Sequence, residues 1–215
     1  MALPIILPLF PLPNVVLFPQ VLLPLHIFEP RYRQMVRDAA ATDELIGMIL
    51  LRGPEGDPSG RDVYPVGCAG RIIRKVDLPD GRSNILLQGV REFVAEEQYF
   101  DKPYRTAAVE WRGVVRDFRL EATFREHLIA CIRRFVDNEK QDETSLRILS
   151  DPTLGDEMLV NLFAFALDFP VAEKQALLET PNPDARARRL VETLEFHNLE
   201  REFGSGGETS KLRWQ

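Results

Sequence analysis

Few residues of this sequence stand in a pattern that could do chemistry. The three histidines, His26, His127 and His197, fall in different segments of the chain. The two cysteines, Cys68 and Cys131, lie one in each half, and a single pair of cysteines cannot form a metal site alone. The sequence therefore predicts no metal site. Two cysteines are also too few for a disulfide scaffold, which favours a reduced compartment.

The common catalytic motifs are missing as well. No Gly-Lys dipeptide occurs, which excludes a P-loop and with it the usual way of binding ATP. No serine stands in a G-x-S-x-G elbow, since Ser59 follows Pro58 and Ser83 falls in a predicted hairpin turn. Cys131 lies in an apolar helical pattern, which is typical of a small buried side chain. The sequence predicts no catalytic residue and no cofactor. A small hydrolase with a dispersed site stays open as an alternative, because such a site leaves little trace in sequence.

Composition and charge narrow the classes of partner. With 45% hydrophobic and 28% charged residues, the chain can form a folded core. Its net charge of −6 is opposite in sign to that of a protein whose main task is to bind phosphate backbones. Nucleic acid is therefore not the expected partner.

The first 30 residues are unusual, because they contain seven of the 16 prolines and no charged side chain before Glu29. A transmembrane helix needs about 20 apolar residues without such interruptions. A secretory signal would begin with positive residues, and none precedes this stretch. We expect no membrane partner and a cytoplasmic location. The apolar residues between the prolines indicate irregular or edge strands, where proline is tolerated.

The hydrophobic period changes near Gly113. Before Gly113, short apolar segments between turn signals predict strands. One helix is predicted to begin at Pro30, because Tyr32, Met35, Val36 and Ala39 follow at helical spacing. The predicted strands are Leu3–Phe10, Leu22–Ile27, Ile46–Leu51, Val63–Ile73, Asn84–Gln88, Glu92–Glu96 and Arg105–Trp111. After it, a period of about 3.6 residues predicts helices. These are Phe118–Val136, Leu154–Phe169, Pro170–Glu179 and Pro183–Phe203.

Several short motifs follow one another along the chain. The opening contains Leu7-Pro8-Leu9, the run NVVLFP from Asn14 to Pro19, Leu23-Pro24-Leu25 and then Ile27-Phe28-Glu29 before the predicted helix. Late in the chain stands KQALLE, from Lys174 to Glu179. With these motifs the sequence resembles the N-terminal, substrate-binding domain of Lon protease over roughly residues 3–200.

The resemblance implies an α+β fold. It implies a PUA-like β pseudo-barrel over residues 1–113, a C-terminal helical bundle over 114–203 and a flexible tail over 204–215. In Lon this region helps to capture damaged or tagged polypeptides for an AAA+ ATPase and a Ser–Lys protease. Neither of those parts is found in these 215 residues, so we expect a stand-alone domain that is not an enzyme.

The leading hypothesis is a polypeptide-binding module that presents unfolded or damaged polypeptides to a separate protease or chaperone. The candidate binding residues are His26, Phe28, Arg31 and Tyr32, which mix aromatic and polar character where a strand passes into a helix. The competing interpretation places Phe28 in the core and pairs Arg31 with a local acid. An RNA-binding module is the alternative function, since PUA-like folds include RNA binders, and a homodimer through the helical part stays open.

Overall fold

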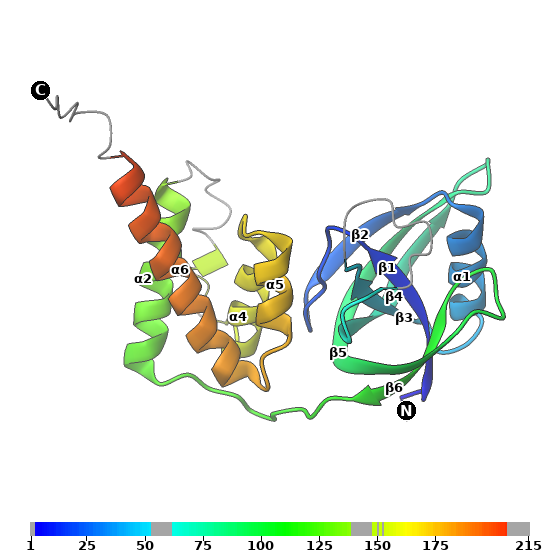
Figure 1. Ribbon diagram of the computed structural model, residues 1–215, viewed down its shortest axis with the longest axis horizontal. Coiled ribbons are helices and arrows are strands. Elements are labelled where there is room, and N and C mark those ends of the chain that lie inside the picture. Colours follow the sequence, from blue (N-terminus) through cyan, green and yellow to red (C-terminus); the bar gives the residue numbers. More distant parts are fainter. Residues whose placement is uncertain (1–2, 53–61, 139–147, 150, 152, 206–215) are drawn as a thin grey trace, which may run out of the picture. The chain divides into compact units, whose positions relative to one another are not determined.

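The computed structural model describes residues 3–52, 62–138, 148–149, 151 and 153–205 (Figure 1). The chain divides into two compact units. The first comprises residues 1–116 and 161–180, and the second comprises residues 117–160 and 181–215. With a mixed six-stranded sheet and separate helices, the protein has the α+β class that the sequence predicts.

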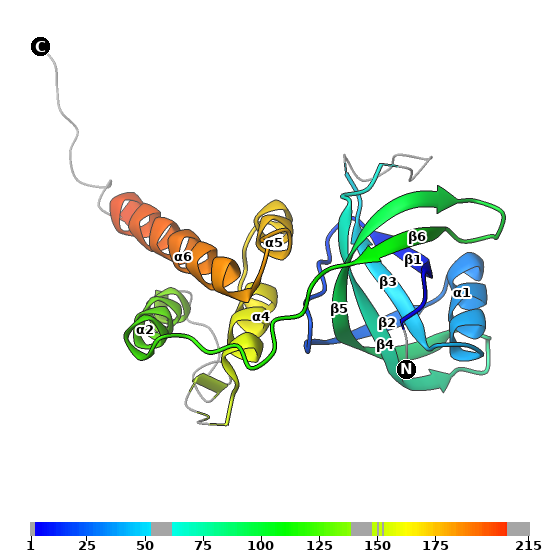
Figure 2. The same ribbon diagram turned by 90° about the horizontal axis from the view of Figure 1, so that it is seen from below.

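The first unit is built on one sheet. Its strands are β1 (Ile6–Leu12), β2 (Leu22–Ile27), β3 (Leu45–Leu50), β4 (Val66–Asp77), β5 (Ser83–Tyr99) and β6 (Thr106–Trp111). The strand order is β2-β5-β4-β3-β1-β6, and β5 also pairs with β6, so the sheet closes on itself and leaves β2 outside the closure. Among the strand pairs that the structure describes, β1 and β3 run parallel and the others antiparallel. Figure 2 shows the long β5 curving around the other strands.

The prolines of β1 fit the strand because each half of β1 is paired on one side only. Ile6 to Pro8 pair with β6, and Leu9 to Leu12 pair with β3. Each half therefore behaves as an edge strand, where a residue without an N–H is tolerated. Leu7 and Leu9 alternate with Pro8 and are fully buried in the core of the closed sheet. This confirms the prediction of irregular or edge strands for this stretch.

The two strands predicted at Asn84–Gln88 and Glu92–Glu96 are one continuous strand, so this prediction was wrong. Gly89 lies between the two predicted segments, inside the continuous strand. A Cβ at Gly89 would lie 2.0 Å from the carbonyl oxygen of Phe18. Glycine is required there because the loop before β2 approaches the backbone of β5, and not because the strand ends.

Helix α1 (Pro30–Ala40) confirms the predicted helix, with proline in its first turn. It packs against β1 and β3, and its buried residues are the four at the predicted spacing, Tyr32, Met35, Val36 and Ala39. In both Figure 1 and Figure 2 it lies to one side of the strands.

The first unit also includes the later part of α4 (Asp156–Ala166) and α5 (Val171–Leu178). The Asn161 amide donates a hydrogen bond to the carbonyl of Pro19, and the Gln175 amide donates one to Val66. Both side chains are almost fully buried. Residues far along the chain thus complete the unit that the strands begin.

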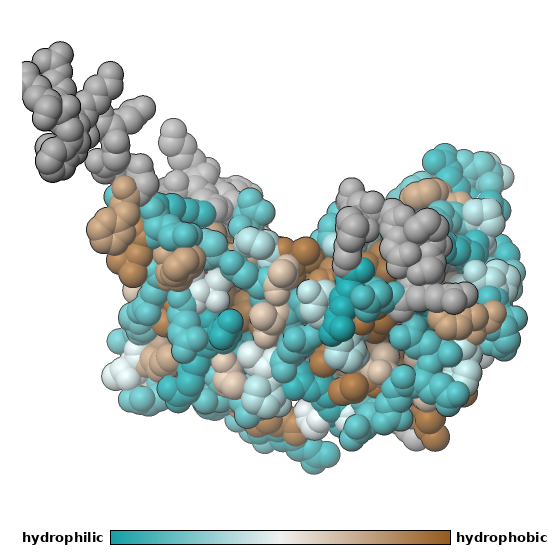
Figure 3. Space-filling view, in the orientation of Figure 1, coloured by the Kyte–Doolittle hydropathy of each residue, from teal (hydrophilic) through white to brown (hydrophobic). Residues whose placement is uncertain are grey.

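The second unit contains α2 (Ala122–Asn138), the start of α4 and α6 (Pro183–Ser205). α2 packs against α6, and the buried residues of the two helices include Leu128, Ile132, Phe135, Leu190 and Leu194. Hydrophobic side chains are also visible on the surface near the end of α6, at the upper left of Figure 3. Among the described residues, no helix combines the length and the hydropathy needed to cross a bilayer.

Candidate polypeptide-binding surface

Strand β2 offers a free edge. It pairs with β5 from Leu22 opposite Gln88 to Ile27 opposite Ser83. Among the strands that the structure describes, none pairs with β2 on its other side. Such an edge presents backbone N–H and C=O groups that an extended chain can pair with. Pro24 sits in the middle of the strand and removes one of these donors, which limits uncontrolled pairing.

The outward face of β2 carries apolar side chains. Leu23 and Ile27 point into the core and are 7% and 1% exposed, so the alternate residues point outward. Leu22 is 47% exposed, and Pro24 and His26 are exposed as well. Phe28, just after the strand, is 60% exposed, and its ring stacks on that of His26 at 6.2 Å between centroids. We call Leu22, Pro24, His26 and Phe28 the β2 strip.

The exposed face continues onto the neighbouring strands. Leu86 of β5 lies opposite Pro24, and Arg74 of β4 lies opposite Leu86. Cross-strand partners share one face of the sheet. A register shift between Ile72 and Arg74 leaves Ile73 46% exposed beside this face. The β2 strip therefore borders further apolar surface.

A polar cluster holds His26 in place. The Nη1 of Arg82 lies 3.3 Å from His26 Nε2, and His26 Nδ1 lies 2.7 Å from Asn84 Oδ1. A guanidinium only donates, so Nε2 accepts and the Nδ1–H donates to Asn84. Arg82 also bonds to Asp80 at 2.6 Å, and this contact lowers the pKa of the Asp80 carboxyl. The imidazole is thereby held in one orientation beside Phe28.

The four predicted binding residues fall into two groups. His26 and Phe28 lie together in the β2 strip, and Phe28 is not part of the core that the competing interpretation expected. Arg31 is exposed and forms an ion pair with Glu29 at 2.9 Å, as that interpretation expected.

Tyr32 is buried where α1 packs against β1. It is 6% exposed and packs on Phe10, with 4.3 Å between the ring centroids. Burial raises the pKa of its phenol. The guanidinium of Arg31 covers its ring at 4.5 Å. Tyr32 is therefore a core residue, whereas His26 and Phe28 are exposed.

Sequence reasoning missed a hollow in the first unit. It has a volume of about 680 Å³, and its lining residues are Ile6, Gln98, Tyr99, Phe100, Asp101, Lys102 and Thr106. Phe100 and Ile6 are both 54% exposed at its rim. No sequence signal indicated it, because Ile5 and Ile6 stand in an apolar run that favours burial, yet both are exposed.

The geometry gives little support to the hydrolase alternative. Cys131 Sγ lies 3.7 Å from His127 Nε2, and the same nitrogen lies 3.0 Å from Glu195 Oε1. A thiol–imidazole–carboxylate relay needs the thiol and the acid on different ring nitrogens. Burial and the nearby Glu195 raise the pKa of the Cys131 thiol, whereas a nucleophilic cysteine needs a lowered one.

Comparison with known proteins identifies relatives of this chain. The family model of the ATP-dependent protease La (LON) substrate-binding domain matches residues 6–195. The Lon protease of Flavobacterium johnsoniae is 30% identical over 205 residues, which cover 92% of this chain and 24% of that protein. The Lon protease of Anaeromyxobacter dehalogenans is 30% identical over 195 residues, 89% of this chain and 23% of that protein. The chain thus spans about a quarter of the length of these curated relatives.

Solved structures agree on the fold. A Lon N-terminal domain protein from Xanthomonas campestris superimposes with a TM-score of 0.65 at 24% identity, over 86% of this chain and 96% of that one. The N-terminal domain of Lon protease from the Mycobacterium avium complex gives a TM-score of 0.64 at 16% identity, over 89% and 99% of the two chains. These comparisons bear out the resemblance read from the opening motifs.

Proposed function

Because the chain belongs to the Lon substrate-binding domain family, we propose that it binds unfolded or damaged polypeptides through the β2 strip. The observation that carries this proposal is the exposure of Leu22 and Phe28 beside a free strand edge. An unfolded chain differs from a native protein in offering both extended backbone and apolar side chains. The strip and the edge match these two features.

The binding mode follows from strand geometry. A six-residue strand is about 20 Å long, which suits an equally short extended segment of the bound polypeptide, here called the client. Client backbone groups would pair with the edge of β2, and alternate apolar side chains would cover Leu22 and Phe28. Complete burial of a Leu or Phe contributes about 1.5–3 kcal/mol, and these two are already half covered. The interaction is therefore weak and reversible, which suits a protein that passes its clients on.

The wider role is part of the proposal. We propose that the module acts without catalysis in the cytoplasm and presents its clients to a separate protease or chaperone. The closed part of the sheet, β5-β4-β3-β1-β6, would be the PUA-like pseudo-barrel that the resemblance implies. Self-association as a homodimer is compatible with this role, because it would double the number of strips available to one client.

The affinity for an unfolded protein tests the proposal. Reduced and carboxymethylated α-lactalbumin, labelled for fluorescence anisotropy, should bind more tightly than its native form. Phe28→Ser should weaken this binding about fivefold to tenfold through lost apolar contact. Phe196→Ser is a matched control, because Phe196 is 57% exposed but lies on α6.

Three outcomes would count against the proposal. Equal affinity for the native and unfolded forms would contradict recognition of unfolded chains. An unchanged affinity in Phe28→Ser would place the binding elsewhere than the β2 strip. Tight binding of homopolymer RNA that falls steeply with salt would favour the RNA-binding alternative.

A further inference from the structure

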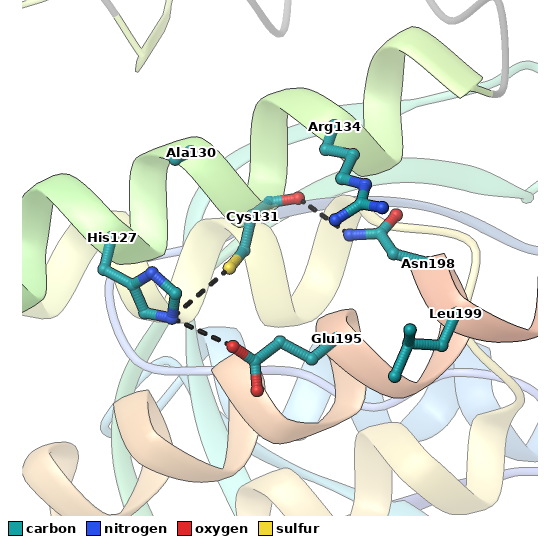
Figure 4. A pocket seen from close by; sticks show the side chains of 7 residues that line it. All are labelled: His127, Ala130, Cys131, Arg134, Glu195, Asn198 and Leu199. Carbon is teal, nitrogen blue, oxygen red and sulfur yellow. Dashed lines mark hydrogen bonds and ion pairs between the residues drawn. The ribbon is translucent and has the colours of Figure 1, made fainter. Parts of the chain in front are cut away.

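Three potential metal ligands converge in the second unit. His127 and Cys131 lie on α2, and Glu195 lies on α6 (Figure 4). One ligand atom from each lies within 4.8 Å of the other two. They line a pocket of about 340 Å³ together with Ala130, Arg134, Asn198 and Leu199. The function proposed above does not use any of them.

Helix packing explains why these side chains meet. Residues four apart lie on the same face of a helix, so His127 and Cys131 point the same way from α2. The Asn198 amide of α6 donates a hydrogen bond to the Cys131 carbonyl at 3.4 Å, which fixes the two helices beside each other at this level. Glu195 lies one turn before Asn198 and therefore faces the same pair.

The three side chains are poorly matched as a hydrogen-bonded group. His127 Nε2 is 3.0 Å from Glu195 Oε1 and 3.7 Å from Cys131 Sγ. A ring nitrogen carries either one proton or one lone pair, so it can form a good hydrogen bond with only one of these two neighbours. A cation among the three atoms would satisfy the nitrogen, the sulfur and the carboxylate at once.

We propose that His127, Cys131 and Glu195 bind a zinc ion that joins α2 to α6, with water in the remaining position. Zinc–ligand bonds of about 2.0–2.3 Å at tetrahedral angles place ligand atoms roughly 3.3–3.6 Å apart. The nitrogen lies 3.0 and 3.7 Å from the other two atoms, and all three lie within 4.8 Å of one another, so side-chain rotations can bring them to these distances. The side chains of His127 and Glu195 are 51% and 50% exposed, so they can make these rotations.

The donor set selects the kind of ion. Sulfur and imidazole nitrogen favour zinc and similar transition metals, whereas magnesium and calcium prefer oxygen alone. Binding displaces the Cys131 thiol proton, and the resulting thiolate and the Glu195 carboxylate balance the two charges of the ion. Arg134, the nearby cation, forms an ion pair with Glu202 of α6.

Absorption of the cobalt-loaded protein tests the site. The full chain, titrated with Co²⁺, should bind one ion and show a thiolate-to-cobalt charge-transfer band that Zn²⁺ abolishes. Cys131→Ser should remove the band, and Glu195→Gln should weaken binding at least about tenfold. Cys68→Ala and Glu192→Gln are the matched controls, because Cys68 is the other cysteine and Glu192 lies one turn before Glu195 on α6.

Thermal unfolding gives a second measurement of zinc binding, one that does not use the thiolate absorption band. Excess Zn²⁺ should raise the Tm of the wild-type chain and of Glu192→Gln clearly more than that of Glu195→Gln, whose exposed position leaves the fold intact. A missing charge-transfer band would overturn the proposal, as would a band that persists in Cys131→Ser. An equal rise in Tm for Glu195→Gln and Glu192→Gln would overturn it as well.

Discussion

Arg112 shows how a single side chain can hold distant parts of the first unit together. Its guanidinium forms an ion pair with Glu92 of β5 at 2.8 Å. It also donates to the carbonyls of Leu178 at 2.9 Å and Thr180 at 2.6 Å, at the end of α5. The last carbonyls of a helix have no partner within the helix, so Arg112 satisfies groups that would otherwise lose their hydrogen bonds on burial.

Loss of Arg112 should destabilise the protein. Arg112→Ala breaks a largely buried ion pair and removes the hydrogen bonds that Arg112 donates to carbonyls at the end of α5, so we expect a loss of about 2–3 kcal/mol in the free energy of unfolding. Urea denaturation would measure it. Arg31→Ala is the control, because the Arg31–Glu29 pair is exposed and should contribute little. Equal effects of the two substitutions would contradict the role given to Arg112.

At the level of single residues, part of the candidate site could be predicted from the sequence. The helical spacing of Tyr32 with Met35 and Val36 already indicated burial, and the structure confirms it. The exposure of Phe28 could not be read from the sequence, because it depends on which elements cover the end of β2. The sequence predicted no metal site, although His127 and Cys131 stand four residues apart, and it could not place Glu195, which comes from another helix that only folding brings near.

The long strand β5 connects the elements of the first unit. It pairs with β2 through its first half, with β6 through its second half and with β4 along most of its length. At Gly89 the strand meets the loop before β2, with hydrogen bonds from Gln20 N to Gly89 O at 2.8 Å and from Gly89 N to Val21 O at 2.9 Å. This contact fixes where β2, and with it the β2 strip, begins.

Substitution of Gly89 should therefore disrupt this junction. A Cβ there would meet backbone, which no side-chain rotation can relieve, so Gly89→Ala should cost about 3 kcal/mol or more of stability. Gly113→Ala is the matched control, because a Cβ at Gly113 meets nothing within 4 Å. The midpoints of chemical denaturation compare the two. A Gly89→Ala protein as stable as Gly113→Ala would show that the loop does not approach β5 closely.

Helices and strands with a regular spacing of hydrophobic residues were predicted well. Those whose ends depend on contacts with distant residues were not. α1 and α6 begin at their predicted prolines because proline suits a first helical turn. β4 runs on to Asp77, beyond the predicted end at Ile73, because it pairs with β5 up to the turn at Pro79–Gly81. No local pattern distinguishes a glycine that ends a strand from one that admits a neighbouring backbone.

At the scale of the whole molecule, the chain returns to the first unit after it has begun the second. Residues 161–180 belong with the strands, although they follow α2 in the sequence. The apolar character of α4 indicated burial on most sides. From the sequence, this helix was predicted to lie in the bundle of residues 114–203, because hydrophobicity alone does not specify which elements cover a helix. The motifs of the opening stretch predicted the family, since they reflect the particular turns and edges of this sheet.

Hydrogen exchange tests the central claim, that unfolded polypeptides bind along β2. Amide exchange of the full chain would be followed by mass spectrometry with and without reduced and carboxymethylated α-lactalbumin. Pairing of a client with the edge of β2 should slow exchange within Leu22–Phe28 and leave α6 unchanged. Protection confined to α2 and α6, with Leu22–Phe28 unaffected, would contradict the account.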